Sequence, residues 1–314
     1  MSLLWLVAGF VLLLVGGELL VRGAAALALR FGMSPLLIGL TVVACGTSAP
    51  ELVVSVDAAL RGSPGIAIGN VVGSNIANIL LILGIAAILR PVPAQAGSLL
   101  RDGGMVVLAT AVMVGIGWTG AFLWWHGVAM LAALATYLLL SYRRDIRLNR
   151  ALAPAVEPIA RKPAWQALLL VVAGLAGLVF GAEWLVDGAV EIAQRLGVSD
   201  AVIGVTMVAI GTSLPELAVV VVAARKGQTD MVFGNVIGSN IFNCLGILGT
   251  TSLVGRIPVD RAALGFDFLV MAAATLLLLP MAASGLRLSR AEGTLLVALY
   301  AAFILVNFYG KPAI

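Results

Sequence analysis

The chain repeats itself at a fixed offset, and this duplication constrains the fold more than any other feature of the sequence. A shift of 165 residues superimposes residues 39–51 on residues 204–216. The same shift superimposes residues 69–78 on residues 234–243. Over residues 39–84, 27 of 46 positions are identical without a gap, and they include Asn, Glu, Ser and Thr as well as apolar residues. The sequence therefore predicts two structurally equivalent halves.

The composition identifies the environment in which these halves fold. Of the 314 residues, 61% are hydrophobic and 11% are charged, whereas soluble domains carry about 25% charged residues. This balance excludes a soluble protein, most classes of enzyme and a nucleic-acid-binding role. Because a membrane helix takes about 20 apolar residues, we expect an all-α polytopic membrane protein with ten spans. They are predicted at 3–29, 35–60, 66–89, 103–124, 126–141, 165–193, 200–224, 231–254, 262–284 and 291–308.

One long polar stretch, rich in Arg and Pro, divides the spans into two groups of five. The predicted organisation is a first five-helix repeat over 1–141, a basic linker over 142–163 and a second five-helix repeat over 164–314. Because five is an odd number, the second repeat must enter the bilayer in the opposite sense to the first. Such inverted-topology repeats place their substrate site near the midplane, on interrupted helices, and alternate access to it by rocking.

The positive charges predict the orientation. Counted by alternate loops, 13 Lys and Arg residues fall on the side of the linker and 5 on the other, with Arg22 inside the first span. By the positive-inside rule, the linker is cytoplasmic and both termini are external. The first apolar run lacks a basic start and contains Glu18, so we expect a retained helix and not a signal peptide. Cys45 and Cys244 fall inside apolar runs and are expected to act as small hydrophobic residues.

The second predicted span carries a cluster of oxygen-bearing side chains. Thr47, Ser48 and Glu51 are three or four residues apart and share one face of a helix. Pro50 cannot donate to the carbonyl of Gly46, so the helix is expected to break there and expose backbone carbonyls. The seventh span repeats this arrangement with Gly211, Thr212, Ser213, Pro215 and Glu216.

A carboxylate at the centre of a membrane needs compensation, because burying it costs at least ~2.5–3.5 kcal/mol. No Lys or Arg lies near the middle of the spans that carry Glu51 and Glu216. The compensating charge must come from protons or bound cations. Two carboxylates, four hydroxyls and free carbonyls suit a hard cation such as Ca²⁺, which takes about 6–8 oxygen ligands. The structural alternative is a protonated glutamate that is hydrogen-bonded within the helix bundle.

A second polar row lies in the third span, where Asn70, Ser74 and Asn78 recur every four residues. The eighth span repeats it with Asn235, Ser239 and Asn243. Glycine pairs beside each row permit close helix contact. For Asn70 and Asn75 and their second copies, hydrogen bonding between helices is an equal alternative to a ligand role.

Other charged residues receive structural interpretations. Glu18 and Arg22 are four residues apart and are expected to pair on one helix face, in a structural or gate-adjacent role. Asp102 and Asp267 fall where spans are predicted to begin, and are expected to be helix N-caps.

The duplicated motifs, residues 46–51 with 69–75 and their second copies, resemble those of the sodium/calcium exchangers of the cation/calcium antiporter superfamily. The chain is similar to a compact prokaryotic member without a large regulatory loop. The resemblance implies four cation sites around Glu51 and Glu216, and alternating access in which Na⁺ and Ca²⁺ compete for shared ligands. It also implies that sliding of the first and sixth spans opens the site to one side or the other.

The resemblance also implies the remaining ligands. Beside the glutamates it assigns Thr47, Ser48, Thr212 and Ser213, with carbonyls from Ala44 and Ala209. It completes the sites with Ser74, Asn78, Ser239 and Asn243. Well-studied members often carry Asp at one of the two asparagine positions, and here both are Asn. This departure removes one titratable oxygen pair and leaves the ion set, the stoichiometry and the role of protons open.

The sequence thus favours an antiporter that exchanges Ca²⁺ for Na⁺ across a prokaryotic inner membrane. A Ca²⁺/H⁺ or Na⁺/H⁺ antiporter that uses the same glutamates is the first alternative, and a passive cation channel is the second. An enzyme is not expected, because no nucleophile or metal motif accompanies the carboxylates. We expect no cofactor, no nucleic-acid partner and no obligatory protein partner, and inorganic cations and the lipid bilayer as the partners.

Overall fold

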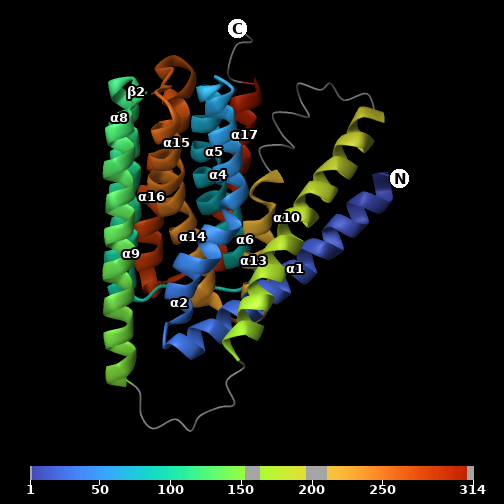
Figure 1. Cartoon of the computed structure of the whole chain (residues 1–314), viewed down its shortest axis with the longest axis vertical. Helices are drawn as coiled ribbons and strands as arrows, with labels where there is room; N and C mark the ends of the chain where they lie inside the picture. The colour runs from blue at the N-terminus through green and yellow to red at the C-terminus, as the bar shows by residue number, and fades with distance from the viewer. Residues whose placement is uncertain (1, 153–162, 196–210, 310–314) are drawn as a thin grey trace. The chain divides into compact units, whose positions relative to one another are not determined.

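The computed structural model describes residues 2–152, 163–195 and 211–309, and these residues form helices joined by short turns (Figure 1). The elements of the first half, in chain order, are α1 (Ser2–Phe31), α2 (Pro35–Ile38), η1 (Gly39–Val43), α3 (Ala44–Thr47), α4 (Ala49–Leu60), α5 (Pro64–Ile76), η2 (Ala77–Ile82), α6 (Leu83–Leu89), β1 (Val92–Pro93), α7 (Ala96–Ser98), η3 (Leu99–Gly103), α8 (Gly104–Thr119), β2 (Ala121–Phe122) and α9 (Trp124–Leu152).

The second half continues in the same pattern. Its described elements are α10 (Ala164–Arg195), α13 (Leu214–Arg225), α14 (Thr229–Ile241), η5 (Phe242–Ile247), α15 (Leu248–Val254), β3 (Ile257–Pro258), α16 (Arg261–Ala283), η6 (Ser284–Leu286), β4 (Arg287–Leu288) and α17 (Arg290–Tyr309). Here η1, η2, η3 and η5 are π-helical, and η6 is a 3₁₀ turn.

Eight helices in the described part of the chain are long and apolar enough to cross a membrane. Each corresponds to one predicted span. The span predicted at 35–60 consists of two helices, Pro35–Thr47 and Ala49–Leu60, bent by 43°. Of the span predicted at 200–224, residues 200–210 lie outside the described residues, and α13 covers most of the remainder. A helical protein with eight candidate spans, or nine with the bent pair, is therefore established.

The chain divides into two compact units, and each takes segments from both halves of the sequence. Unit 1 comprises Met1–Glu51 and Ala133–Gly238, and unit 2 comprises Leu52–Ala132 and Ser239–Ile314. The segment boundaries differ between the two copies, since α5 lies in unit 2 whereas most of α14, its counterpart at the repeat offset, lies in unit 1.

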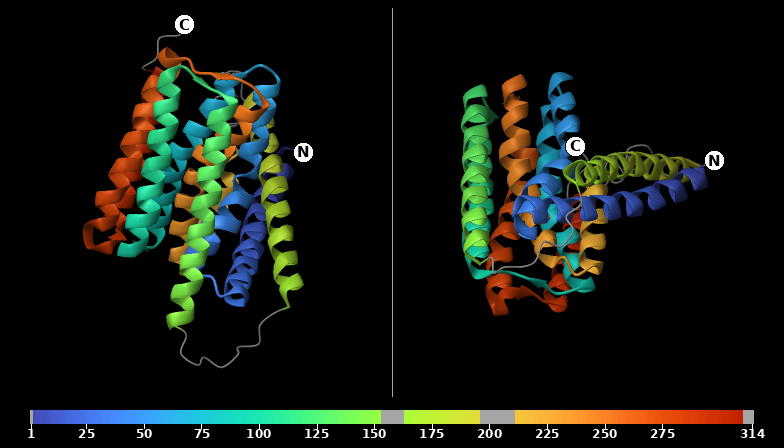
Figure 2. Two further views of the ribbon diagram at one scale, coloured as in Figure 1. Left: turned by 60° about the vertical axis from the view of Figure 1, so that its left-hand side comes forward. Right: turned by 60° about the horizontal axis from the view of Figure 1, so that its bottom comes forward.

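Within unit 1, α1 and α10 lie side by side (Figure 2) and pack through glycines at unusually short range. A Cβ atom added at Gly9 would collide with the backbone of Leu185, and one at Gly23 would lie 2.8 Å from the backbone nitrogen of Val171. Gly16 makes the same kind of contact between them. The partner residue number falls as the α1 number rises, so the helices are antiparallel. Small residues allow this approach where membrane helices gain little from the hydrophobic effect.

A second close contact in unit 1 joins the segment that precedes the first helix break to α14. A Cβ atom at Gly234 would collide with the carbonyl of Leu36, and one at Gly238 with that of Leu40. A Cβ atom at Gly39 would lie 2.6 Å from the carbonyl oxygen of Met231. The glycine pair predicted to permit close helix packing in the second repeat does so here.

In unit 2, two short antiparallel ladders connect the sequence halves. Strand β1 pairs with β4, with Val92 opposite Leu288, and β3 pairs with β2, with Ile257 opposite Phe122. Val92 and Ile257 are 165 residues apart, which is the repeat offset. Each half of the sequence thus supplies two strands, and each of them pairs with a strand of the other half.

The structure corrects the interpretation of two aspartates and extends one helix. Asp102 lies inside η3, fully buried, and Asp267 lies in the interior of α16, so neither is an N-cap. Ser98 Oγ donates to Asp102 at 2.6 Å, and Arg101 forms a two-pronged ion pair with the same carboxylate. For Asp102, hydropathy placed the span start too late, because α7 and η3 add two turns before α8. For Asp267 the predicted start is within one residue of the observed one, Arg261, and the aspartate lies inside the helix. Helix α9 continues past Ser141 to Leu152, through the first part of the predicted linker; residues 153–162 lie outside the described residues.

Candidate cation-binding site

The first motif breaks its helix at Ser48, and the second motif has the same turn at Ser213, immediately before α13. Ser48 has φ −85° and ψ 9°, and Ser213 has φ −90° and ψ 3°. Helices α4 and α13 start at the next residue, with proline in their first turn, where its missing N–H is tolerated. The predicted interruption is confirmed at Ser48, and the matching angles at Ser213 show the same local conformation in the second copy.

The two motifs meet within unit 1 and exchange hydrogen bonds. Ser48 Oγ donates to Glu216 Oε1 at 2.8 Å, and Ser213 Oγ lies 3.4 Å from Glu51 Oε1. Each glutamate is therefore held by a hydroxyl from the other repeat. Both carboxylates are 1% exposed.

The geometry leaves oxygen atoms available to a ligand. Glu216 Oε2 is buried and has no hydrogen-bond partner among the described residues, and no described lysine or arginine forms an ion pair with this glutamate. A buried acceptor without a partner is costly unless a ligand satisfies it. In the described part of the chain, no three His, Cys, Asp or Glu side chains gather as a metal cluster. A cation held here would take hydroxyl, amide or carbonyl oxygens beside the two carboxylates.

The remaining predicted ligands of unit 1 lie at the same break. Thr47 Oγ1 donates to the carbonyls of Val43 and Ala44, at 3.1 and 3.3 Å. The Ala44 carbonyl also accepts the Ser48 N–H at 3.0 Å, so it is engaged within its own helix end. Thr47 lies beside Glu216, and Thr212 beside Glu51. Ala209, the other predicted carbonyl ligand, lies outside the described residues.

Three further side chains support the site, and two of them, Leu175 and Val186, have no signal in the motifs. Asn235 Nδ2 lies 3.4 Å from Thr47 Oγ1, which ties the second polar row to the first motif. A Cβ atom at Gly46 would lie 2.7 Å from Leu175, and one at Gly211 would lie 2.7 Å from Val186. Both of these apolar residues belong to α10. The helix that pairs with α1 therefore also packs against the glycine of each motif, Gly46 and Gly211.

Unit 2 contains the other four predicted ligands, each in a buried position. Ser74 Oγ, Asn78 Oδ1, Ser239 Oγ and both polar atoms of Asn243 have no hydrogen-bond partner among the described residues. Asn78 and Asn243 are each the second residue of a π-helical turn, η2 and η5 respectively. π-helical turns are frequent at functional sites, because they redirect a side chain and loosen the backbone ladder.

Asn75 has a structural role in the same unit. Its Nδ2 donates to Cys244 Sγ at 3.1 Å and so joins α5 to η5. Asn70 Nδ2 similarly donates to Ser55 Oγ at 2.9 Å and joins α5 to α4. For these two asparagines the structure shows the interhelical hydrogen bonds that were the alternative to a ligand role.

The predicted pair of Glu18 and Arg22 is confirmed, with one addition. Glu18 accepts from Arg22 on the same helix and also from Lys226, which follows α13. The lysine was missed because it lies 208 residues from Glu18 in the sequence. This ion pair links α1 to the end of the helix that carries Glu216.

Comparison with known proteins decides the family. The family model described as sodium/calcium exchanger protein matches residues 1–143 and 166–309. The chain belongs to the sodium/calcium exchanger family. A sodium/calcium exchanger of Methanosarcina acetivorans, MaX1, is 36% identical over 98% of this chain and 99% of its own length. The Escherichia coli inner membrane protein YrbG is 34% identical over 85% of this chain and 84% of its own length.

A solved structure of another sodium/calcium exchanger has the same fold as this chain. The sodium-calcium exchanger NCX_Mj, soaked with Na⁺ and Sr²⁺, superimposes with a TM-score of 0.85. The identity is 35%, and the match covers 100% of this chain and 99% of that one. With its apolar helices, the protein is therefore an integral, multi-pass membrane protein of a transporter family, and not of an enzyme family.

Proposed function

We propose that the protein is a secondary active antiporter that exchanges Ca²⁺ for Na⁺, with Glu51 and Glu216 as the central ion ligands. The observation that carries this proposal is the pair of buried carboxylates at two helix breaks, each contacted by a serine of the other motif. Family membership and the relatives named as sodium/calcium exchangers support it.

Charge balance argues for competition between the two ions at one site. Two ionised glutamates in a low-dielectric interior are neutralised by one Ca²⁺ or by two Na⁺, and neither state leaves an uncompensated buried charge. A third Na⁺ would make the exchange move net charge across the membrane. Protons on the same carboxylates would be a third way to neutralise them, which keeps Ca²⁺/H⁺ or Na⁺/H⁺ exchange as the alternative.

The proposed ligand set extends beyond the glutamates. In unit 1 it includes the hydroxyls of Thr47, Ser48, Thr212 and Ser213 and the carbonyls of Ala44 and Ala209. Ser74, Asn78, Ser239 and Asn243 are proposed as further ligands because their polar atoms are buried and have no partner in the described part of unit 2. Their neutral oxygens suit Na⁺ and Ca²⁺, both of which prefer oxygen ligands.

We further propose ten spans in two inverted repeats, 1–141 and 164–314, joined by the basic linker 142–163, with alternating access between them. The equal offset of the two helix breaks, of the turns η2 and η5, and of the strands β1 and β3 supports the repeat. The two segments matched by the family model start 165 residues apart, which supports it independently.

The proposed setting is a prokaryotic inner membrane, with the linker in the cytoplasm and both termini outside. The excess of Lys and Arg on the linker side supports this orientation. The inner membrane location named for YrbG supports the compartment.

Flux into vesicles distinguishes the candidate functions. Purified protein reconstituted in proteoliposomes should take up ⁴⁵Ca²⁺ when Na⁺ is trapped inside and absent outside. An imposed pH gradient without Na⁺ should drive little uptake. Uptake driven only by the pH gradient would establish the proton-coupled alternative. Equal Ca²⁺ flux without any counter-ion would establish a channel.

A further inference from the structure

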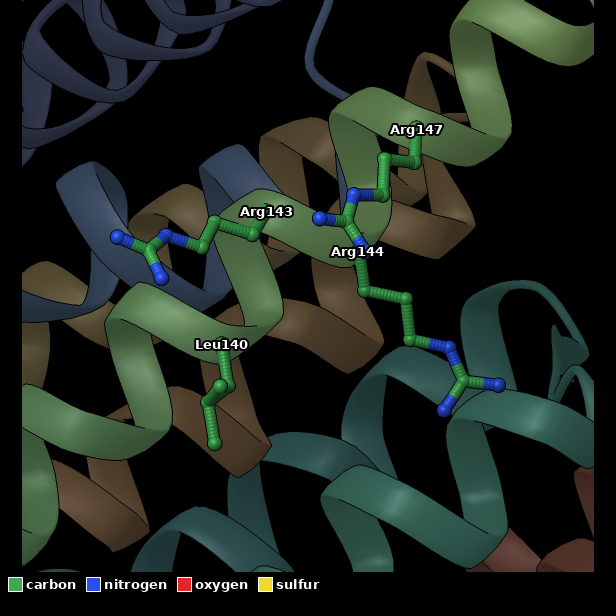
Figure 3. A pocket seen from close by; sticks show the side chains of 4 residues that line it. All are labelled: Leu140, Arg143, Arg144 and Arg147. Carbon is green, nitrogen blue, oxygen red and sulfur yellow. The ribbon is translucent and has the colours of Figure 1, made fainter.

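A buried cluster of amide and sulfur-bearing side chains in unit 2 lies directly beside the proposed ligands. It consists of Asn75 on α5, Cys244 in η5 and Met271 on α16, each at most 1% exposed. In this it differs from the arginines at the end of α9, whose side chains extend outward around a surface pocket (Figure 3). Hydrogen bonds within the buried cluster are shielded from water, which strengthens them.

The side-chain amide of Asn75 donates to both sulfur atoms of the cluster. Its Nδ2 lies 3.1 Å from Cys244 Sγ and 3.6 Å from Met271 Sδ. Thiol and thioether sulfurs are weak acceptors, but here they hold the amide from two other elements at once. Thr275 donates to the Met271 carbonyl at 2.8 Å and lies 3.5 Å from Thr110 of α8. The cluster thus ties α5 to η5 and α16, and α16 to α8.

Each partner in the bond between Asn75 and Cys244 is the chain neighbour of a proposed ligand. Asn75 follows Ser74, and Cys244 follows Asn243. A rotation of α5 that moved the Asn75 amide would also move the Ser74 hydroxyl, because both belong to the same helix. The same holds for Cys244 and Asn243 within η5. The bond therefore constrains the distance between the Ser74 and Asn243 side chains.

The sulfur atoms of the cluster occur in one copy of the repeat only. The repeat offset pairs each proposed ligand of unit 2 with an identical residue, Ser74 with Ser239 and Asn78 with Asn243. The acceptors are not repeated, because Cys244 and Met271 correspond to Ile79 and Val106, whose side chains cannot accept a hydrogen bond. The equivalent place in the fold forms without sulfur acceptors, so packing alone does not require them. Since the ligands are chemically identical, a difference between the two copies must come from the residues that hold them.

We infer that Asn75 and Cys244 are positioning residues that set the spacing of the unit 2 ligands and thereby the size of the cation that the protein prefers. The inference rests on the proposed function, because it takes Ser74 and Asn243 as ligands of the transported ion. Selectivity among cations depends on the size and the flexibility of the ligand cage. A cage held by buried hydrogen bonds discriminates more sharply between Ca²⁺ and the larger Sr²⁺ than a cage that adjusts to either ion.

The ratio of the apparent KM values for Sr²⁺ and Ca²⁺ tests the inference. Na⁺-driven uptake of each ion is measured separately in proteoliposomes that contain the full chain. Cys244→Val keeps a side chain of similar size but removes the acceptor, and Cys244→Ser keeps an acceptor. We expect the wild type to prefer Ca²⁺ and Cys244→Val to lose at least about three-fold of that preference, the size expected for one neutral hydrogen bond. The kcat should change little, and Cys244→Ser should keep the wild-type ratio.

Two more variants test the bond itself. Asn75→Leu removes the donor in place of the acceptor and serves as the test if Cys244→Val does not insert. Combined with Cys244→Val, it should change the ratio no more than either single variant does, because both remove the same interaction. Ile79→Val is the matched control, since Ile79 holds the position of Cys244 in the first copy and offers no acceptor. It should keep the wild-type ratio.

The outcomes separate this inference from the proposed function. An unchanged KM ratio in Cys244→Val, with Ca²⁺ uptake intact, would overturn the inference and leave the proposed function standing. A lower midpoint of thermal unfolding without a change in the ratio would show a purely structural role and would overturn it as well. Equal loss of preference in Ile79→Val would do the same. Failure of the wild type to take up Ca²⁺ against Na⁺ would refute the proposed function, and the inference with it.

Discussion

The hydroxyl of Ser48 donates to Glu216 across 168 residues of sequence, at 2.8 Å, while the equivalent Ser213 hydroxyl lies 3.4 Å from Glu51. The serine of each motif copy thus contacts the carboxylate of the other copy, and the contact from Ser48 is the shorter of the two. A bound cation would share these oxygens. Each half of the chain would then be incomplete as a cation site without the other.

Replacing either glutamate by glutamine should abolish Ca²⁺ transport. Glu51→Gln and Glu216→Gln keep the side-chain volume but remove one of two charges that balance a divalent ion. Initial rates of Na⁺-driven ⁴⁵Ca²⁺ uptake in proteoliposomes measure the effect. Glu191→Gln is the control, since Glu191 is exposed and pairs with Arg195 on its own helix. Exchange retained in either site variant, at the rate of the control, would refute the assignment.

The two serines should differ in their effect on Ca²⁺ affinity. A hydrogen bond to a charged group contributes about 1.5–3 kcal/mol, so Ser48→Ala should weaken apparent Ca²⁺ affinity by about ten-fold or more. Ser213→Ala should weaken it less, because its contact with Glu51 is longer. The apparent KM for Ca²⁺ in the uptake assay gives both values. A larger effect at Ser213 would contradict this account of the asymmetry.

Helix α10 should limit the size of the residue at the first helix break. A Cβ atom at Gly46 would lie 2.7 Å from Leu175 Cδ2, a distance that forces the leucine to move. We expect Gly46→Ala to lower the transport rate several-fold and the double variant with Leu175→Ala to recover part of it. Leu175→Ala alone is the reference. Additive losses in the double variant would show that the two residues do not act through this contact.

An added carboxylate in unit 2 should change the ion preference. Asn243 has no hydrogen-bond partner for either polar atom in the described part of the chain. Asn243→Asp would supply a third negative charge, so uptake should depend more steeply on the Na⁺ gradient. Asn307→Asp is the control, because Asn307 bonds to the Phe303 carbonyl of its own helix. An unchanged Na⁺ dependence in Asn243→Asp would exclude this position from the ligand set.

The sequence was sufficient to predict the features that depend on residues close to one another along the chain. Pro50 and Gly46 predicted the break that the structure places at Ser48, because proline removes a backbone donor in any context. Hydropathy located the helices, since a membrane span needs a long apolar run. The spacing of Glu18 and Arg22 predicted their ion pair, because residues four positions apart are neighbours on the surface of a helix.

Features that depend on distant contacts could not be predicted. The π-helical turns at Asn78 and Asn243 have no periodic signal, and the contact of Leu175 with Gly46 depends on how α10 packs. Asp102 was misread as a cap because its burial with Arg101 follows from the two turns that precede α8. The partner of Glu18 beyond its own helix, Lys226, is likewise a tertiary contact.

The position of the bound ion tests the central claim most directly. A crystal structure of the protein soaked with Ca²⁺ and a low concentration of Na⁺ should show ion density contacted by carboxylate oxygens of both Glu51 and Glu216. Ca²⁺–oxygen distances of about 2.3–2.6 Å are expected, and high Na⁺ should displace the density. Ca²⁺ density elsewhere in the protein, with both glutamates free of it, would contradict the proposed site.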